Sequence, residues 1–302
     1  MSVVEKALRK AREAQQEGSE ASAANADKTP AKADANSRPS AARAFAGEQS
    51  PPIVLDRDAL RAAGLLPPVT EERRLSSQYR KIKRPLIANA IGRGAERLPN
   101  GYLIMLASAM PGEGKTFTAL NLALSIATEK DFSVLLVDAD VPKPQLSRIF
   151  GLEGEQGLLD VLRDPKLDVD SAIRRTDIPT LSFLPAGKSS ADATELLASK
   201  RMEDLATLLG ERDSHRIVLF DTPPLIQTTE SPVLMHVAGQ ILVVVRAEST
   251  PQPVLLDALA TLQDHPAVSL MLNQSMRSDT AAYYYYGYGE ERSDRAAATP
   301  SK

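Results

Sequence analysis

The sequence predicts an α/β fold: a parallel sheet covered by helices on both faces, with a helical N-terminal extension and a disordered linker and tail. From Gly101 onward, short apolar runs alternate with segments of helical periodicity. Runs that are apolar along their whole length are typical of parallel strands that are buried on both faces. A glycine-rich loop also leads from the first of these strands into the first helix, an arrangement that can bind phosphate.

The first 69 residues are expected to precede the main domain. Residues 1–16 place Val4, Ala7, Leu8 and Ala11 at helical spacing among basic residues, which predicts a short basic amphipathic helix. This helix either docks on the protein's own surface or contacts a partner or a membrane surface. Residues 17–69 are expected to form a flexible linker, because large apolar residues are almost absent up to Pro52.

One domain is predicted over residues 70–275. Its leading helix starts near Thr70, and Pro85 is expected to kink or end it. One face of this helix is strongly basic, and the other carries Leu75, Tyr79, Ile82 and Leu86. Strands are expected near residues 102–107, 133–138, 181–185, 216–221, 240–246 and 267–273, with helices between them. The tail, residues 276–302, is polar apart from its tyrosines and is expected to be disordered.

Composition excludes several classes of function. The 302 residues include no cysteine, so disulfides, thiolate catalysis and cysteine metal sites are excluded. The 36 basic and 39 acidic residues give a net charge of -3, which provides no overall field to attract nucleic acid, and no nucleic-acid partner is expected. Apolar stretches are far shorter than the roughly 18 residues of a spanning helix, and we expect a cytoplasmic protein.

The segment from Ala107 to Thr116 has the sequence and the context of a phosphate-binding loop, or Walker A motif. It follows a predicted strand and leads into a predicted helix. Gly112 and Gly114 allow the backbone to curl so that its N–H groups point at phosphate oxygens. Lys115 can then reach the β- and γ-phosphates, and the Thr116 hydroxyl can ligate Mg²⁺. The fold is therefore expected to be P-loop NTPase-like, although Ala109 replaces the usual first glycine.

Three carboxylates follow predicted strands at their carboxyl ends. Asp138 ends the strand near 133–138 and Asp140 follows it, while Asp221 ends the strand near 216–221. Ligands bind at this edge of open parallel sheets. Mg²⁺ prefers oxygen ligands, and phosphoryl transfer uses a carboxylate near the phosphate. These aspartates are therefore candidates for a metal and catalytic site.

The order of P-loop, Asp-x-Asp and hydrophobic-Asp-x-Pro-Pro resembles the bacterial protein-tyrosine kinases, which are P-loop relatives of the MinD and ParA ATPases. Met110 stands where the MinD and ParA type carries a signature lysine, which favours a kinase. The N-terminus and the segment from Tyr79 to Leu86 are similar to autokinases from exopolysaccharide loci. The resemblance implies ATP and Mg²⁺ as cofactors, and self-association of the chain so that transfer occurs in trans. It also implies a membrane-anchored activator of the polysaccharide co-polymerase type, which recruits the chain to the inner face of the membrane.

The same resemblance implies roles for individual residues. Those expected to be catalytic are Lys115, Asp138 and Asp140. Those expected to bind the nucleotide are Gly112, Glu113, Gly114, Lys115, Thr116, Phe117 and Asn273, the last near the adenine. Thr116, Asp140 and Asp221 are expected to hold the metal.

Two segments depart from the family pattern. Members commonly follow Asp-x-Asp with Leu-Arg-Arg-Pro, whereas this chain leaves Lys143 as the only basic residue there. Ring-forming members carry Glu-x-x-Arg-x-x-Arg in the helix before the loop. The matching positions are Ser77, Arg80 and Lys83, and the missing glutamate argues against a ring-shaped oligomer.

A tyrosine cluster in the tail is the expected acceptor. It consists of Tyr283, Tyr284, Tyr285, Tyr286 and Tyr288. A tail that can enter an active site suffices as substrate, because phosphoryl transfer depends chiefly on positioning and charge neutralisation. The leading hypothesis is an ATP-dependent tyrosine autokinase that regulates exopolysaccharide synthesis or export. The alternatives are a MinD/ParA-type ATPase acting as an assembly or positioning switch, and a nucleotide-sensing scaffold with an adhesive aromatic tail.

Overall fold

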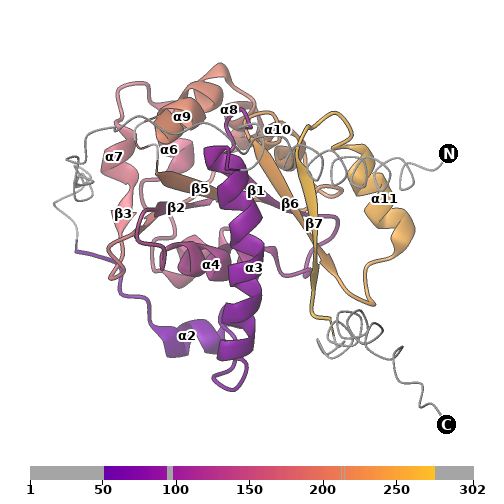
Figure 1. Ribbon diagram of the computed structural model, residues 1–302. Coiled ribbons are helices and arrows are strands. Elements are labelled where there is room, and N and C mark those ends of the chain that lie inside the picture. The colour runs from indigo at the N-terminus through magenta and orange to yellow at the C-terminus, as the bar shows by residue number, and fades with distance from the viewer. Residues whose placement is uncertain (1–50, 94–97, 212, 214, 276–302) are drawn as a thin grey trace, which may run out of the picture. The chain divides into compact units, whose positions relative to one another are not determined.

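A seven-stranded sheet lies at the centre of the computed structural model, which describes residues 51–93, 98–211, 213 and 215–275 (Figure 1). The strands are β1 (Leu103–Ser108), β2 (Ser133–Asp138), β3 (Arg174–Arg175), β4 (Leu181–Leu184), β5 (Arg216–Asp221), β6 (Gln240–Arg246) and β7 (Val268–Asn273). Their order is β3-β4-β2-β5-β1-β6-β7. Neighbours are parallel except β3 and β4, which are antiparallel. The predicted fold class is confirmed, and β3 is a two-residue addition too short for a sequence pattern.

Helices cover both faces of the sheet. They are α2 (Arg57–Ala62), α3 (Glu72–Ile91), α4 (Lys115–Ile126), α5 (Gln145–Ile149), α6 (Leu158–Arg163), α7 (Val169–Ala172), α8 (Ala193–Leu197), α9 (Lys200–Glu211), α10 (Glu230–Leu234) and α11 (Gln252–Ala260). Helices α3 and α4 lie on one face, whereas α6, α8 and α9 lie on the other (Figure 1). None of the helices in the described part is both long and apolar enough to cross a membrane.

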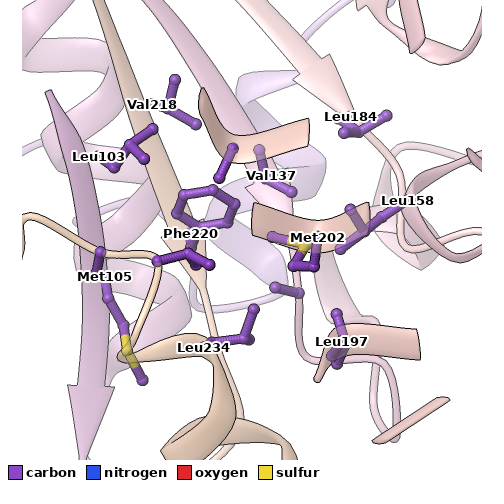
Figure 2. Packing of buried hydrophobic residues seen from close by; sticks show 14 of the residues in the cluster. Leu103, Met105, Val137, Leu158, Leu184, Leu197, Met202, Val218, Phe220 and Leu234 are labelled. Atoms are coloured by element: carbon purple, nitrogen blue, oxygen red, sulfur yellow. The ribbon is translucent and has the colours of Figure 1, made fainter. Parts of the chain in front are cut away.

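The sheet separates two apolar clusters because successive side chains of a strand point to opposite faces. In β1, Leu103 and Met105 belong to the cluster under α6, α8 and α9, while Ile104 and Leu106 face α3 and α4. Figure 2 shows the first cluster, in which Phe220 lies close to Leu103 and Met105. Burial on both faces explains why these strands read as continuous apolar runs.

The segment from 53 to 66 belongs to the fold, although the sequence analysis assigned residues 17–69 to a flexible linker. The Ile53 N–H donates to the Arg175 carbonyl over 2.8 Å, beside the β3 strand. Asp56 caps α2 with its side chain, which accepts from the N–H groups of residues 58 and 59. The apolar residues that anchor the segment in the second cluster are Leu55, Leu60, Leu65 and Leu66. The rest of the predicted linker up to residue 50, the N-terminal helix over 1–16 and the tail over 276–302 lie outside the described residues.

Helix α3 runs through Pro85 instead of ending there. Pro85 is exposed, while Leu86 and Ala90 beyond it are buried in the second cluster. Packing of these residues holds the last turns in place, and the helix ends at Gly92, whose left-handed backbone (φ 71°) allows its N–H to donate to the Ala88 carbonyl.

Lys83 lies inside the basic face that the sequence predicts for α3, but it is buried. Its ammonium donates to the Ser125 carbonyl and to the Thr128 hydroxyl (3.1 Å) and pairs with Glu129 at 2.7 Å. A cation at the last carbonyls of α4 also interacts favourably with that helix's dipole. Lys83 therefore fastens α3 to α4 within one chain, whereas Arg80 is exposed.

Candidate active site

The predicted phosphate-binding loop joins β1 to α4, as the sequence requires. Gly112 and Gly114 adopt left-handed backbone conformations, with φ of 79° and 92°. Side chains other than glycine are strained in this region, so the two glycines are what permits the curl of the loop. Helix α4 begins at Lys115, and its free N–H groups and partial positive charge face the loop. The local structure is that of an anion-binding loop.

The first half of the loop is held by its own chain. The Met110 N–H donates to Glu113 Oε2 over 2.7 Å, and the Ser108 hydroxyl donates to the Met110 carbonyl over 2.9 Å. Glu113 is buried, so its side chain faces the protein and not the opening of the loop. The nucleotide contact predicted for Glu113 stays a prediction, and the burial of the side chain leaves the backbone as the part that could make it.

Two of the three predicted carboxylates meet beneath the loop. Strands β2 and β5 are neighbours, and Asp138 lies directly opposite Asp221 in their register. Both side chains are almost fully buried. Within the described residues, Asp138 Oδ1 is buried without a hydrogen-bond partner, and the buried Asp221 oxygens have none apart from the nearby Thr116 hydroxyl. Buried acceptors of this kind are costly unless a ligand satisfies them.

Burial and mutual repulsion disfavour the charged forms of this pair. Burial, with the nearby Asp221 carboxylate, raises the pKa of Asp138 to about 8, although Ser147 partly opposes the shift. Burial likewise raises the pKa of Asp221 to about 7, and the Lys115 ammonium and the Thr116 hydroxyl offset part of that rise. Lys115 thus lies close enough to Asp221 to favour its ionised form.

Short hydrogen bonds fix the orientation of the Asp138 carboxylate and the position of the turn that follows Asp221. Asp138 Oδ2 accepts from the N–H and the hydroxyl of Ser147, each over 2.8 Å. The Ser147 hydroxyl also accepts from the Ala186 N–H at the end of β4, over 3.0 Å. After Asp221, the Thr222 hydroxyl donates to the Leu106 carbonyl over 2.8 Å, which ties the Asp-Thr-Pro-Pro turn to β1. Asp138 is therefore held by one oxygen while the other is left without a partner.

A cleft of about 1770 Å³ opens above the loop and extends along α3 to β7. The predicted site residues that line it are Gly112, Gly114, Lys115, Thr116, Phe117, Asp140 and Asn273. Burial raises the pKa of Asp140, an effect that Lys115 and Lys143 oppose. The structure thus gathers the loop, Lys115 and the three aspartates at one end of the sheet, with Asp140 at the surface of the cleft and the other two below it.

The donor set fits a magnesium ion bound together with a nucleotide. No cluster of three or more His, Asp or Glu side chains able to hold a metal occurs in the part of the chain that the structure describes. Mg²⁺ commonly takes one or two protein ligands and completes its shell with water and phosphate oxygens. The buried Asp221 oxygens, together with the nearby Thr116 hydroxyl, can supply these one or two protein ligands.

Asn273 lies at the loop, but both ends of its amide are already engaged. Its Nδ2 donates to the Glu113 carbonyl over 2.9 Å, and its Oδ1 accepts from the Gln274 N–H over 2.9 Å. Its side chain approaches Gly114 so closely that a Cβ there would meet Nδ2 at 2.2 Å. These contacts assign Asn273 to the support of the loop; its predicted contact with adenine stays a prediction.

Sequence reasoning missed two residues of this neighbourhood. Ser147 was not recognised because it lies in the helix after Asp140 and meets Asp138 only through the fold. Thr250, whose hydroxyl donates to Glu113, is 137 positions away from it in the chain. The residues around Ser147 are a mixture of polar and apolar types and give no local signal for its role.

Comparison with known proteins places the chain in a family. The model of the AAA domain family AAA_31 matches residues 102–269. Tyrosine-protein kinase YwqD of Bacillus subtilis is 33% identical over 223 residues, which cover 72% of this chain and 90% of that protein. The putative tyrosine-protein kinase EpsB of Ralstonia nicotianae is 34% identical over 189 residues, 62% of this chain, but the match spans only 24% of EpsB.

A solved structure agrees with these relatives. The BceF tyrosine kinase domain superposes with a TM-score of 0.58 at 26% identity, over 72% of this chain and 87% of that one. The family match covers the P-loop, both strand-end aspartate sites and the strands that position them. The chain therefore belongs to the bacterial tyrosine-protein kinases, a family built on an AAA-type P-loop domain.

Proposed function

We propose that this chain is an ATP-dependent tyrosine autokinase that transfers the γ-phosphoryl group of ATP to its tail tyrosines, Tyr283, Tyr284, Tyr285, Tyr286 and Tyr288. The observation that carries the proposal is the convergence of the P-loop, Lys115 and Asp140 at a cleft where β7 also ends, with the buried pair Asp138 and Asp221 below it. Tyr283 follows Asn273 by ten residues, a span of at most about 36 Å. The cluster can therefore reach its own site or that of a neighbour.

The loop and Lys115 bind and neutralise the phosphates in this proposal. Backbone N–H groups around Gly112 and Gly114 orient the β- and γ-phosphates, and the Lys115 ammonium stabilises the charge that spreads over the transferred group. Thr116, Asp140 and Asp221 would hold Mg²⁺, which when bound neutralises phosphate charge. The low exposure of Lys115 strengthens its electrostatic effect, because screening by water is weak there.

Asp138 is the proposed proton acceptor. The tyrosine oxygen forms a bond to the γ-phosphorus, the bond from that phosphorus to the ADP oxygen breaks, and the phenolic proton passes to Asp138 Oδ1. That oxygen is the one without a partner, and Ser147 holds the other. A raised pKa makes Asp138 a stronger base than an exposed aspartate would be.

We also propose that transfer occurs between associated chains, and that a membrane-anchored protein of exopolysaccharide synthesis or export recruits and activates the kinase. The proposal is supported by sequence similarity to longer kinases such as EpsB, in which the matched region is about a quarter of the protein. Rates of tail phosphorylation with and without the cytoplasmic segment of such a membrane protein test this. Equal rates with every candidate would contradict it.

The intact mass of the chain after incubation with ATP and Mg²⁺ tests the autokinase. The wild type should gain one phosphate mass per modified tyrosine, and Lys115→Met should gain none. Lys130→Met is a matched control, because Lys130 is exposed and outside the cleft, and it should behave as the wild type. Unmodified protein with steady release of ADP would indicate an ATPase switch of the MinD/ParA type instead.

A further inference from the structure

A buried carboxylate stands inside the phosphate-binding loop. Glu113 lies between Gly112 and Gly114 and is 3% exposed. A negative group at this place repels the phosphates that the loop is proposed to bind, so its presence calls for a physical reason. Both of its oxygens are used internally: Oε2 accepts from the Met110 N–H over 2.7 Å, and Oε1 accepts from the Thr250 hydroxyl.

Thr250 connects this carboxylate to the end of β6. Its hydroxyl donates to Glu113 and accepts from the Arg246 N–H over 3.2 Å. Arg246 is the last residue of β6, and Thr250 precedes α11. A continuous chain of hydrogen bonds therefore runs from the β6 backbone through the Thr250 hydroxyl and the Glu113 side chain to the Met110 N–H in the loop.

A second route reaches the same residue from the same segment. The Ala247 N–H donates to the Asn273 carbonyl over 2.9 Å, and the Asn273 side chain donates to the Glu113 carbonyl over 2.9 Å. The side chain and the backbone of Glu113 are thus both fixed to the segment that follows β6. The turn in that segment is itself tight, since Glu248 adopts φ of 59°.

We propose that Glu113 and Thr250 are positioning residues, which hold the phosphate-binding loop in its phosphate-ready shape before nucleotide arrives. The inference rests on the proposed function, because it takes the loop to bind ATP. A loop that is already ordered loses little conformational entropy on binding and presents its N–H groups without rearrangement. Loss of the Thr250 hydroxyl leaves Glu113 Oε1 without this donor and frees the loop to sample other conformations.

The dissociation constant for ATP with Mg²⁺ tests the proposal, measured by equilibrium titration of the full chain together with KM and kcat. Thr250→Val should raise the dissociation constant and KM for ATP about tenfold, a factor that corresponds to about 1.4 kcal/mol. The variant should lose more affinity for ATP than for adenosine, because adenosine has no phosphates. Thr250→Ser keeps the hydroxyl and should bind ATP as the wild type does. Thr261→Val is the matched control, because that hydroxyl bonds locally to the Ala258 carbonyl in α11.

Each outcome separates the positioning role from the proposed function. Wild-type affinity in Thr250→Val, or an equal defect in Thr250→Ser, would overturn the positioning role alone. Absence of ATP binding by the wild type would overturn the proposed function and the positioning role with it. Thr250→Ala, which removes the same hydroxyl and leaves Glu113 unchanged, supplies the same comparison should Thr250→Val fail to fold, and wild-type affinity in that variant would likewise overturn the role.

Discussion

Asp138→Asn should make the nucleotide-free protein more stable while it abolishes phosphoryl transfer. The pKa of Asp138 in the folded chain is raised to about 8 from the ordinary 3.8, chiefly by burial and by Asp221. A raised pKa means that the folded state holds a proton which the unfolded state releases. The contribution of Asp138 to stability is therefore complete below pH 3.8, falls as the pH rises, and is lost above about pH 8.

The magnitude follows from the two pKa values. Each pKa unit corresponds to about 1.36 kcal/mol, so the free energy of unfolding is lower by about 4 kcal/mol at pH 7 and by about 2 kcal/mol at pH 5 than it is at acid pH. Asparagine removes this pH-dependent cost and can still accept from the Ser147 N–H and hydroxyl through its carbonyl oxygen. Because a buried amide without a second partner is itself unfavourable, we expect a net gain of about 2 kcal/mol at pH 7.

Urea unfolding without nucleotide, in the presence of a chelator, measures this gain at several pH values. The difference between Asp138→Asn and the wild type should shrink steadily from pH 8 to pH 5. Asp131→Asn is the control, because Asp131 is exposed and far from the carboxylate pair in the sheet register. A variant that is less stable than the wild type at pH 7, or a difference that does not change with pH, would refute the electrostatic account.

Three further predictions follow from single contacts. Ser147→Ala should lower kcat by about tenfold and leave KM for ATP unchanged, because Asp138 loses the hydroxyl that orients it. Single-turnover and steady-state assays measure both constants, and an unchanged kcat would contradict this prediction. Lys83→Met should lower the free energy of unfolding by about 3 kcal/mol, because Glu129 and the last carbonyls of α4 lose a buried cation. Thermal or urea unfolding measures this loss, and unchanged stability would show that Lys83 has only a surface role. Gly114→Ala should abolish ATP binding, since the new Cβ would clash with Asn273 at a backbone φ of 92°; ATP binding by this variant in the titration would show that the loop tolerates the change.

The site was predictable from sequence where its geometry depends on the sheet alone. Asp138 and Asp221 end strands whose apolar runs were recognisable, and parallel register then brings their side chains to one edge. The P-loop likewise needs only the order of strand, glycines and helix. These features are local or repeat along the chain, so a single sequence contains enough information to predict them.

Features that depend on long-range contacts were not predictable. Lys83 belongs to a basic stretch, yet contact with the C-terminal turn of α4 buries it. The linker prediction rests on the composition up to Pro52 and extends over the segment around α2, whose four leucines become a core only against α3 and α4. The hydrogen bond between Glu113 and Thr250 is not predictable either, because the two residues are 137 positions apart in the chain.

Phosphotyrosine mapping of the isolated chain shows whether it phosphorylates its own tail. The chain is incubated with ATP and Mg²⁺, digested, and compared with a variant in which Tyr283, Tyr284, Tyr285, Tyr286 and Tyr288 are phenylalanine. Phosphate should appear on these tyrosines in the wild type and be absent from the phenylalanine variant, and Lys115→Met should stay unmodified throughout. Phosphate that persists elsewhere in the phenylalanine variant at the wild-type level, or ADP release with no phosphotyrosine at all, would contradict this prediction.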